Sequence, residues 1–98
     1  MAKLDAGQIK SKLEALPGWA HRQDAIAKQF EFKEFMDAIR FVEKVAKIAE
    51  AADHHPDMLI NYRRVTFTCS THDQGGITDK DFRLASNIEA AYKSAHGK

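Results

Sequence analysis

Residues 35–72 read FMDAIRFVEKVAKIAEAADHHPDMLINYRRVTFTCSTH, and this stretch decides the fold because a helix, a break and two strands follow one another. Over residues 35–53 the apolar side chains recur every three or four positions, as in an amphipathic helix. They are Phe35, Ala38, Ile39, Val42, Val45, Ala46 and Ala49. Pro56 lacks an amide hydrogen and disfavours the α conformation at the residue before it. The helix is therefore predicted to end near Asp53 or His54.

After this break, residues 58–62 and 65–71 are predicted to be paired strands joined near Arg63 and Arg64. The second strand is rich in β-branched and aromatic residues. Successive side chains of a strand point to opposite faces. One face carries Val65, Phe67, Cys69 and Thr71, and the other carries Thr66, Thr68, Ser70 and His72. This alternation predicts one buried face and one polar face.

Upstream, Asp5 and Gln8 have the spacing of a helix-capping pair, and a short helix is predicted until Pro17 and Gly18 break the pattern. Residues 19–32 have the pattern of two strands around a polar turn at residues 22–24. Lys28 interrupts the apolar side of the second of these strands, which carries Ile26, Phe30 and Phe32.

Downstream, Thr78 followed by Asp81 predicts the capped start of a last helix. Its apolar stripe is Leu84, Ala85, Ile88, Ala91 and Tyr92. Projection of this stripe one turn back, at about 100° per residue, places Asp81 on the inward line. A carboxylate is therefore predicted to face the interior.

The length of 98 residues predicts a single domain over residues 1–98. A net charge of +1 argues against nucleic-acid binding, and no apolar stretch is long enough to span a bilayer. Cys69 is the one cysteine, which excludes an internal disulfide and fits a reducing compartment. The residues that follow Met1 do not form a signal-peptide core, so a cytoplasmic location is expected.

Three of the five histidines, His54, His55 and His72, lie at the ends of predicted elements rather than within apolar stripes. Imidazole titrates near neutral pH, so such a group can supply both a general acid and a general base. Glu50 precedes His54 by four residues, a spacing at which a carboxylate on the same helix can hold an imidazole. Asp53 and Asp73 are alternative partners.

Other interpretations of these residues remain open. A His-His pair at a helix end can interact simply with the exposed carbonyls and the helix dipole, and Asp81 can be only a cap. The histidines with Asp73 or Glu50 also contain enough donor atoms for zinc or iron. However, neighbouring residues of an extended segment point to opposite sides, and the chain has no His-x-His or His-x-x-x-His pair. No metal is therefore expected.

Several separate segments together resemble the pterin-4a-carbinolamine dehydratase family. The segments are Glu50-Ala51-Ala52-Asp53-His54-His55-Pro56, Tyr62, Ser70-Thr71-His72-Asp73, Gly76 and Asp81, with Gly18-Trp19 and residues 30–35 upstream and Leu84-Ala85-Ser86 with Ile88-Glu89 downstream. The resemblance covers nearly the whole chain. It implies an α+β fold, in which three helices pack on one face of a four-stranded antiparallel sheet. This agrees with the order of elements predicted above.

The resemblance also implies the activity and the site. The reaction is the dehydration of 4a-hydroxytetrahydropterin to quinonoid dihydropterin, in tetrahydrobiopterin recycling and without a cofactor. The implied catalytic residues are His54, His55 and His72, and the implied substrate-binding residues are Glu50, Asp53, Ser70, Thr71 and Asp81. Met58 departs from the family, in which many members have Trp at this position, so an aromatic contact with the substrate is lost.

Family members are usually homotetramers built as a dimer of dimers, and animal members also serve as dimerisation cofactors of a homeodomain transcription factor. The 35–53 helix independently indicates a second packing partner or a subunit interface, because a second apolar flank widens its apolar surface beyond one sheet contact. This flank is Phe41, Ile48 and Ala52. The alternative to an enzyme is a non-enzymatic dimerisation or transcriptional coactivator module that retains the pocket as a relic.

Overall fold

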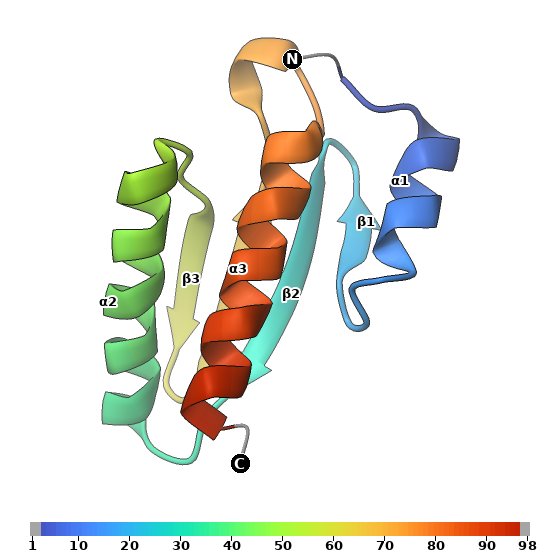
Figure 1. Ribbon diagram of the computed structural model, residues 1–98. Coiled ribbons are helices and arrows are strands. Elements are labelled where there is room, and N and C mark those ends of the chain that lie inside the picture. Colours follow the sequence, from blue (N-terminus) through green and yellow to red (C-terminus); the bar gives the residue numbers. More distant parts are fainter. Residues whose placement is uncertain (1–2, 97–98) are drawn as a thin grey trace.

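The computed structural model describes residues 3–96, so residues 1–2 and 97–98 of the predicted domain lie outside the described part. It confirms the α+β class (Figure 1). The elements are α1 (Ala6–Leu13), β1 (Ala20–Arg22), β2 (Ala25–Glu31), α2 (Phe35–Ala52), β3 (Asp57–Asn61), β4 (Arg64–Cys69), the short 3-10 helix η1 (His72–Gln74) and α3 (Asp79–His96). All strand pairs are antiparallel, in the order β1-β2-β4-β3.

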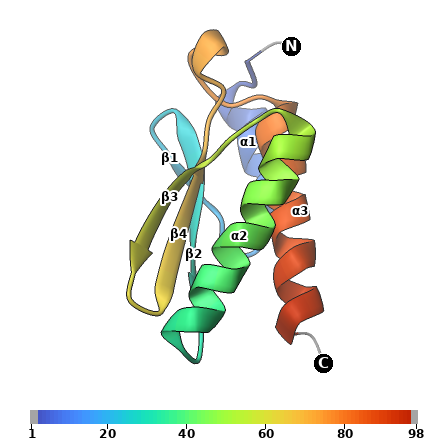
Figure 2. The same ribbon diagram turned by 90° about the vertical axis from the view of Figure 1, so that its left-hand side faces the viewer.

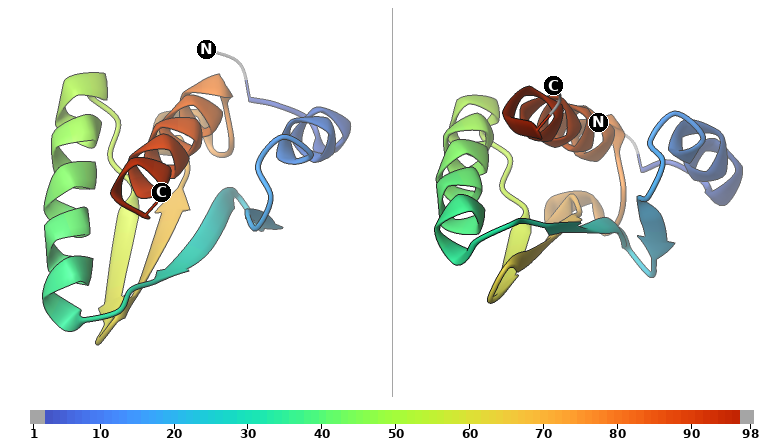
Figure 3. Two further views of the ribbon diagram at one scale, coloured as in Figure 1. Left: turned by 60° about the horizontal axis from the view of Figure 1, so that its bottom comes forward. Right: turned by 90° about the horizontal axis from the view of Figure 1, so that it is seen from below.

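The helices lie on one face of the sheet, as predicted. Figure 2 shows α2 and α3 side by side across that face, and Figure 3, in the view from below, shows α1 on the same side next to β1. Within residues 3–96 no helix lies over the opposite face of the sheet. No helix within residues 3–96 combines the length and apolar character needed to cross a membrane.

The alternation of β4 is confirmed by burial. Val65, Phe67 and Cys69 are fully buried, while Thr66 and Thr68 between them are partly exposed. The core is built largely from aromatic rings that meet edge-on or tilted, with centroids 4.8–6.2 Å from Phe30. These rings are Trp19, Phe41, Phe67 and Tyr92.

Two apolar residues of α2 do not lie where the sequence pattern placed them. Phe41, assigned to a second flank, is 3% exposed and belongs to the core. Phe35, assigned to the core stripe, is 43% exposed and stacks on Tyr62. Phe35 is the first residue of the helix and lies beyond the sheet contact, so the stripe loses its partner there.

Lys28 interrupts the apolar pattern of β2 because it pairs with a carboxylate from α3. It stands opposite Phe67 in the sheet, and its ammonium forms an ion pair with Glu89 and donates to the Pro17 carbonyl at 3.2 Å. Glu89 also accepts a hydrogen bond from the Trp19 indole at 2.9 Å. One carboxylate thus ties the sheet, the last helix and the segment after α1 together.

We expect Glu89→Ala to lower the free energy of unfolding by about 2 kcal/mol, because it leaves a partly buried ammonium and an indole N–H without their acceptor. Urea denaturation measures this change. Glu43→Ala is the matched control, because it removes a Lys–Glu pair whose side chains are exposed, and it should change stability by less than about 0.5 kcal/mol. Equal effects of the two substitutions would contradict this role of Glu89.

Candidate functional site

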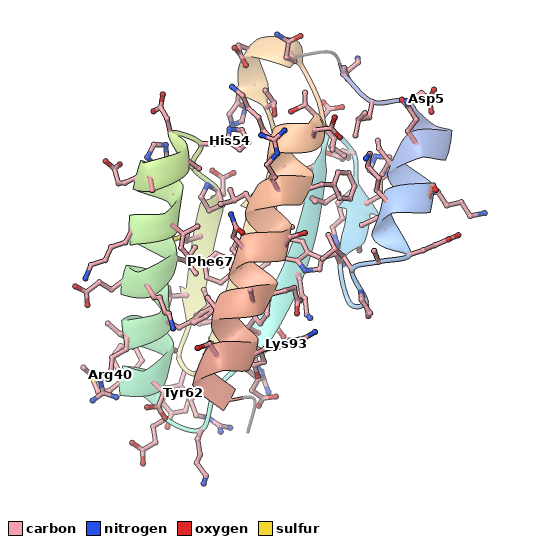
Figure 4. All side chains as sticks on the ribbon, in the orientation of Figure 1. Asp5, Arg40, His54, Tyr62, Phe67 and Lys93 are labelled. Carbon is pink, nitrogen blue, oxygen red and sulfur yellow. The ribbon has the colours of Figure 1, made fainter. Side chains whose placement is uncertain are left out.

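The exit from α2 sets the direction of His54. Asp53 ends the helix in the left-handed conformation, with φ 52°, and the His54 amide donates back to the Ala49 carbonyl at 3.1 Å. This reversal directs the His54 ring toward the start of α3 (Figure 4). There its Nε2 lies 2.6 Å from Oδ1 of Asp81. The His54 side chain is 12% exposed and Asp81 is fully buried.

Asp81 accepts hydrogen bonds on both carboxylate oxygens. Besides His54 on Oδ1, its Oδ2 accepts from the Thr78 backbone N–H at 3.0 Å and from the Thr71 hydroxyl at 2.8 Å. Asp81 also lies in the first turn of α3, where the helix dipole favours negative charge. The ionised carboxylate is the species that satisfies all three donors. Asp81 is therefore both the predicted cap and the partner of His54.

The direction of each hydrogen bond behind Asp81 follows from the number of hydrogens available. Thr71 gives its one hydroxyl hydrogen to Asp81, so in its 2.8 Å contact with Thr78 it accepts and Thr78 donates. The Thr78 oxygen in turn accepts from the Lys80 backbone N–H at 3.2 Å. A directed chain thus runs from the start of α3 to the carboxylate. The sequence pattern identified Thr78 as a cap, but not its contact with Thr71.

This chain assigns the tautomer of His54. Because the Asp81 carboxylate has no hydrogen to give, Nε2 of His54 must donate. Within the described residues Nδ1 makes no hydrogen bond, so this nitrogen is available to a ligand. The same arrangement of a buried carboxylate behind an imidazole orients general bases in other enzymes.

The sequence prediction that Glu50 holds His54 is wrong. Glu50 instead accepts from Nε2 of His55 at 2.7 Å, and both side chains are largely exposed. The reason is the left-handed Asp53, which takes the chain off the helical path, so the four-residue spacing no longer places His54 above Glu50. The two adjacent histidines therefore contact two different carboxylates.

A cavity of about 340 Å³ brings together His54 and His55 from the segment after α2 and His72 from η1. It is lined by Asp53, His54, His55, Ser70, His72 and Asp73. Thr71 and Asp81 are buried behind this wall, and Glu50 lies outside the lining. The predicted site residues thus lie in one region of the molecule. Asp81 and Glu50 do not line the cavity themselves, but each contacts a histidine that does.

Metal binding and nucleophilic catalysis by a cysteine are not supported at this site. Among residues 3–96 no three His, Cys, Asp or Glu side chains converge as metal ligands. Burial raises the pKa of the Cys69 thiol well above its usual range, and the nearby carboxylates of Asp81 and Asp57 raise it further. Cys69 therefore remains a protonated, buried side chain rather than a nucleophile.

A family model described as pterin 4 alpha carbinolamine dehydratase matches residues 2–91. The chain belongs to this family. The family is described as one of dehydratases, which are hydro-lyases.

Individual relatives agree with this membership. A "Putative pterin-4-alpha-carbinolamine dehydratase" of Sulfolobus acidocaldarius is 44% identical, over 88% of this chain and 94% of its own. One of the same name from Mycobacteroides abscessus is 47% identical, over 91% and 95%. The crystal structure of a transcriptional coactivator/pterin dehydratase from Brucella melitensis superposes with a TM-score of 0.87 at 35% identity, over 91% and 97%.

A more distant structure shares the fold alone. It is described as a pterin dehydratase-like protein identified as a RuBisCO assembly factor in the alpha-carboxysome. Its TM-score is 0.61 at 18% identity, over 74% of this chain and 84% of that one. The same architecture therefore carries more than one described role.

We expect Asp81→Asn to keep the fold and to move the His54 proton from Nε2 to Nδ1. The amide oxygen can accept from Thr78 and Thr71, and its NH₂ group then faces His54, so Nε2 must become the acceptor. Ring-nitrogen NMR shifts report the tautomer, and urea denaturation reports the fold. Asp79→Asn, which changes a half-exposed carboxylate two residues away, is the control and should leave the tautomer unchanged. An Nε2–H tautomer in the Asp81 variant would contradict the hydrogen-bond chain.

Proposed function

We propose that this protein dehydrates 4a-hydroxytetrahydropterin to quinonoid dihydropterin by histidine general acid/base catalysis, in tetrahydrobiopterin recycling. The observation that carries the proposal is the cavity lined by three histidines, one of which is oriented by a buried carboxylate. Membership of the dehydratase family supports the reaction type. The proposed enzyme is cytoplasmic, which fits a lone buried thiol.

The reaction needs only two proton transfers. As the N5–H bond breaks, its electron pair forms the C4a=N5 double bond, and the C4a–O bond breaks at the same time. The leaving hydroxyl takes a proton from an acid and departs as water, while a base receives the N5 proton. No atom is oxidised or reduced, so neither a metal nor a cofactor is required. Positioned proton transfer of this kind contributes a factor of about 10² to 10⁴ in rate.

We assign the acid and base roles to His54 and His72, in an order left open. His54 presents Nδ1 because Asp81 holds its other ring nitrogen. His72 comes from η1, whereas His54 comes from the segment after α2, so the two rings reach the cavity from different elements and can act on different atoms of the substrate. His55 is exposed and held by Glu50, which suits the orientation of the substrate.

The remaining predicted residues divide into two groups. Asp53 and Ser70 line the cavity and are proposed to contact the pterin. Thr71 and Asp81 are proposed to act through His54, because both are buried behind it. Met58, where many family members have Trp, packs against the core and is absent from the cavity lining. The pterin is therefore proposed to bind without an aromatic contact from this position.

We expect His54→Ala and His72→Ala each to reduce kcat about 100-fold or more with little change in pterin binding, because a group that acts on the moving proton lowers the barrier alone. His55→Ala should mainly weaken binding. Stopped-flow turnover of 4a-hydroxytetrahydropterin and calorimetric titration with a stable pterin measure the two effects. His21→Ala, in an exposed histidine of β1, is the control and should behave as wild type. Wild-type turnover in both the His54 and His72 variants, with their folds intact, would remove the assignment.

A second candidate function is a non-enzymatic dimerisation or coactivator module. It is favoured by the description of the Brucella melitensis structure as a transcriptional coactivator/pterin dehydratase. The directed chain behind His54 argues for catalysis, because a binding module has no need of a fixed tautomer. Absence of turnover in the wild-type protein would favour the non-enzymatic module over the enzyme.

We also propose a homotetramer built as a dimer of dimers, because two separate apolar surfaces lack a partner among residues 3–96. One is the edge strand β3, where Leu59 is 65% and Ile60 is 41% exposed. The other is a groove of about 550 Å³ between α2 and α3. Its apolar lining is Ile48, Ala51, Ala52, Ala90 and Ala91. Ile48 and Ala52 belong to the flank that predicted an interface.

Sedimentation equilibrium of the wild-type protein should give a mass four times the 11.0 kDa of the chain. Leu59→Asp and Ala52→Glu each place a charge on one surface, so each should yield a species of two chains, and the double variant should be monomeric. Lys47→Glu changes an exposed charge of α2 outside both surfaces and is the control. A wild-type monomer at micromolar concentration would contradict the tetramer.

A further inference from the structure

The hydroxyl pair of Thr71 and Thr78 lies in the interior, next to the wall of the histidine cavity. Thr78 is fully buried and Thr71 is 3% exposed, and their oxygens are 2.8 Å apart. Because solvent does not reach them, both hydroxyls depend on hydrogen-bond partners within the protein. Thr78 is the residue before α3, and Thr71 follows β4 by two residues. The pair therefore links the start of a helix to the end of a strand.

The cap of α3 uses only the oxygen of the Thr78 side chain. This oxygen accepts from the Lys80 backbone N–H at 3.2 Å, as an N-cap residue does. The hydroxyl hydrogen takes no part in the cap and is donated to Thr71 instead. Thr78 thus has two separable functions, one as an acceptor for the helix and one as a donor toward the site.

The hydroxyl of Thr71 has two partners among residues 3–96, Asp81 and Thr78. The Thr71 backbone N–H donates to the Gly76 carbonyl at 2.8 Å, but this bond leaves the hydroxyl free to rotate. The hydrogen bond from Thr78 occupies a lone pair of the Thr71 oxygen, so the Thr71 hydrogen is directed at Asp81. A hydroxyl that accepts one hydrogen bond is also a stronger donor in the next.

We propose that Thr78 is a positioning residue for the dehydration and acts on His54 through Asp81. The two oxygens of Asp81 belong to one planar carboxylate, so a change of donor at Oδ2 alters the Oδ1 that holds Nε2 of His54 at 2.6 Å. Thr78 does not line the histidine cavity, so it acts only through these hydrogen bonds. The inference rests on the proposed function, because it takes His54 to act on a proton of the substrate.

The test replaces the hydroxyl by a methyl group of similar size in Thr78→Val. We expect kcat to fall about three- to tenfold with unchanged pterin binding. The Nε2–H proton resonance of His54, measured by NMR, should move, because the carboxylate that accepts this hydrogen has lost a polarised donor. Thr78→Ser, which donates and accepts as threonine does, should restore both values. In a Thr71→Val background Thr78→Val should cause no further change of either, because the link between the two positions is already broken.

The control separates this role from loss of a helix cap. Asp5→Ala removes the cap of α1 (Figure 4), where the Asp5 carboxylate accepts from the Gln8 N–H at 2.8 Å. It should lower stability in urea denaturation and leave kcat and the His54 resonance unchanged. If Thr78→Val does not fold, Thr78→Ala removes the same hydroxyl without placing a methyl group in its space.

An unchanged resonance and an unchanged kcat in a folded Thr78 variant without the hydroxyl would overturn the role of Thr78. Failure of Thr78→Ser to restore them would overturn it too, as would a further loss in the Thr71→Val background. The NMR measurement needs no turnover, so it separates this failure from failure of the proposed function. A wild-type enzyme that is active and insensitive to the Thr78 substitutions retains the reaction and loses the positioning role. A protein without turnover whose His54 resonance responds to them keeps the coupling of Thr78 to His54 and loses the reaction.

Discussion

The buried carboxylate of Asp81 joins the start of α3, the end of β4 and the exit of α2. It caps the helix through Thr78, accepts the hydroxyl hydrogen of Thr71 and holds His54. A carboxylate with no exposed surface is costly unless its oxygens are matched by donors, and here three donors and the helix dipole supply them. The interaction that stabilises the helix junction is thus the same one that orients the proposed catalytic ring.

The two His–carboxylate pairs found in the described part of the chain have similar lengths and different environments. His54 and Asp81 are 2.6 Å apart and nearly buried, whereas His55 and Glu50 are 2.7 Å apart and largely exposed. Water and salt screen the exposed pair, so it contributes little to rigidity. The buried pair is shielded from solvent and fixes one geometry. Adjacent positions in the sequence therefore acquire unequal roles from burial alone.

The sequence predicted the elements well because each has a strong local signal. The helix of residues 35–53, the Asp5–Gln8 capping box and the alternation of β4 depend on neighbours within a few positions, and the structure confirms all three. The sequence showed Lys28 only as an interruption of the apolar pattern of β2 and did not predict its partner, because Glu89 is 61 residues away. The Glu50 assignment failed for a related reason, because the backbone conformation of Asp53 is not encoded in a spacing rule.

The left-handed conformation of Asp53 sets backbone stability against the chemistry of the cavity lining. A residue other than glycine in this region is strained by about 1 kcal/mol, although aspartate tolerates it better than most. Glycine would relieve the strain at the helix end, yet it would remove a carboxylate from the cavity lining. Because Asp53 is proposed to contact the pterin, selection for thermal stability and selection for activity would act in opposite directions at this one position. In relatives selected for higher stability, we therefore expect glycine to replace aspartate at position 53 before other polar residues of the cavity are lost.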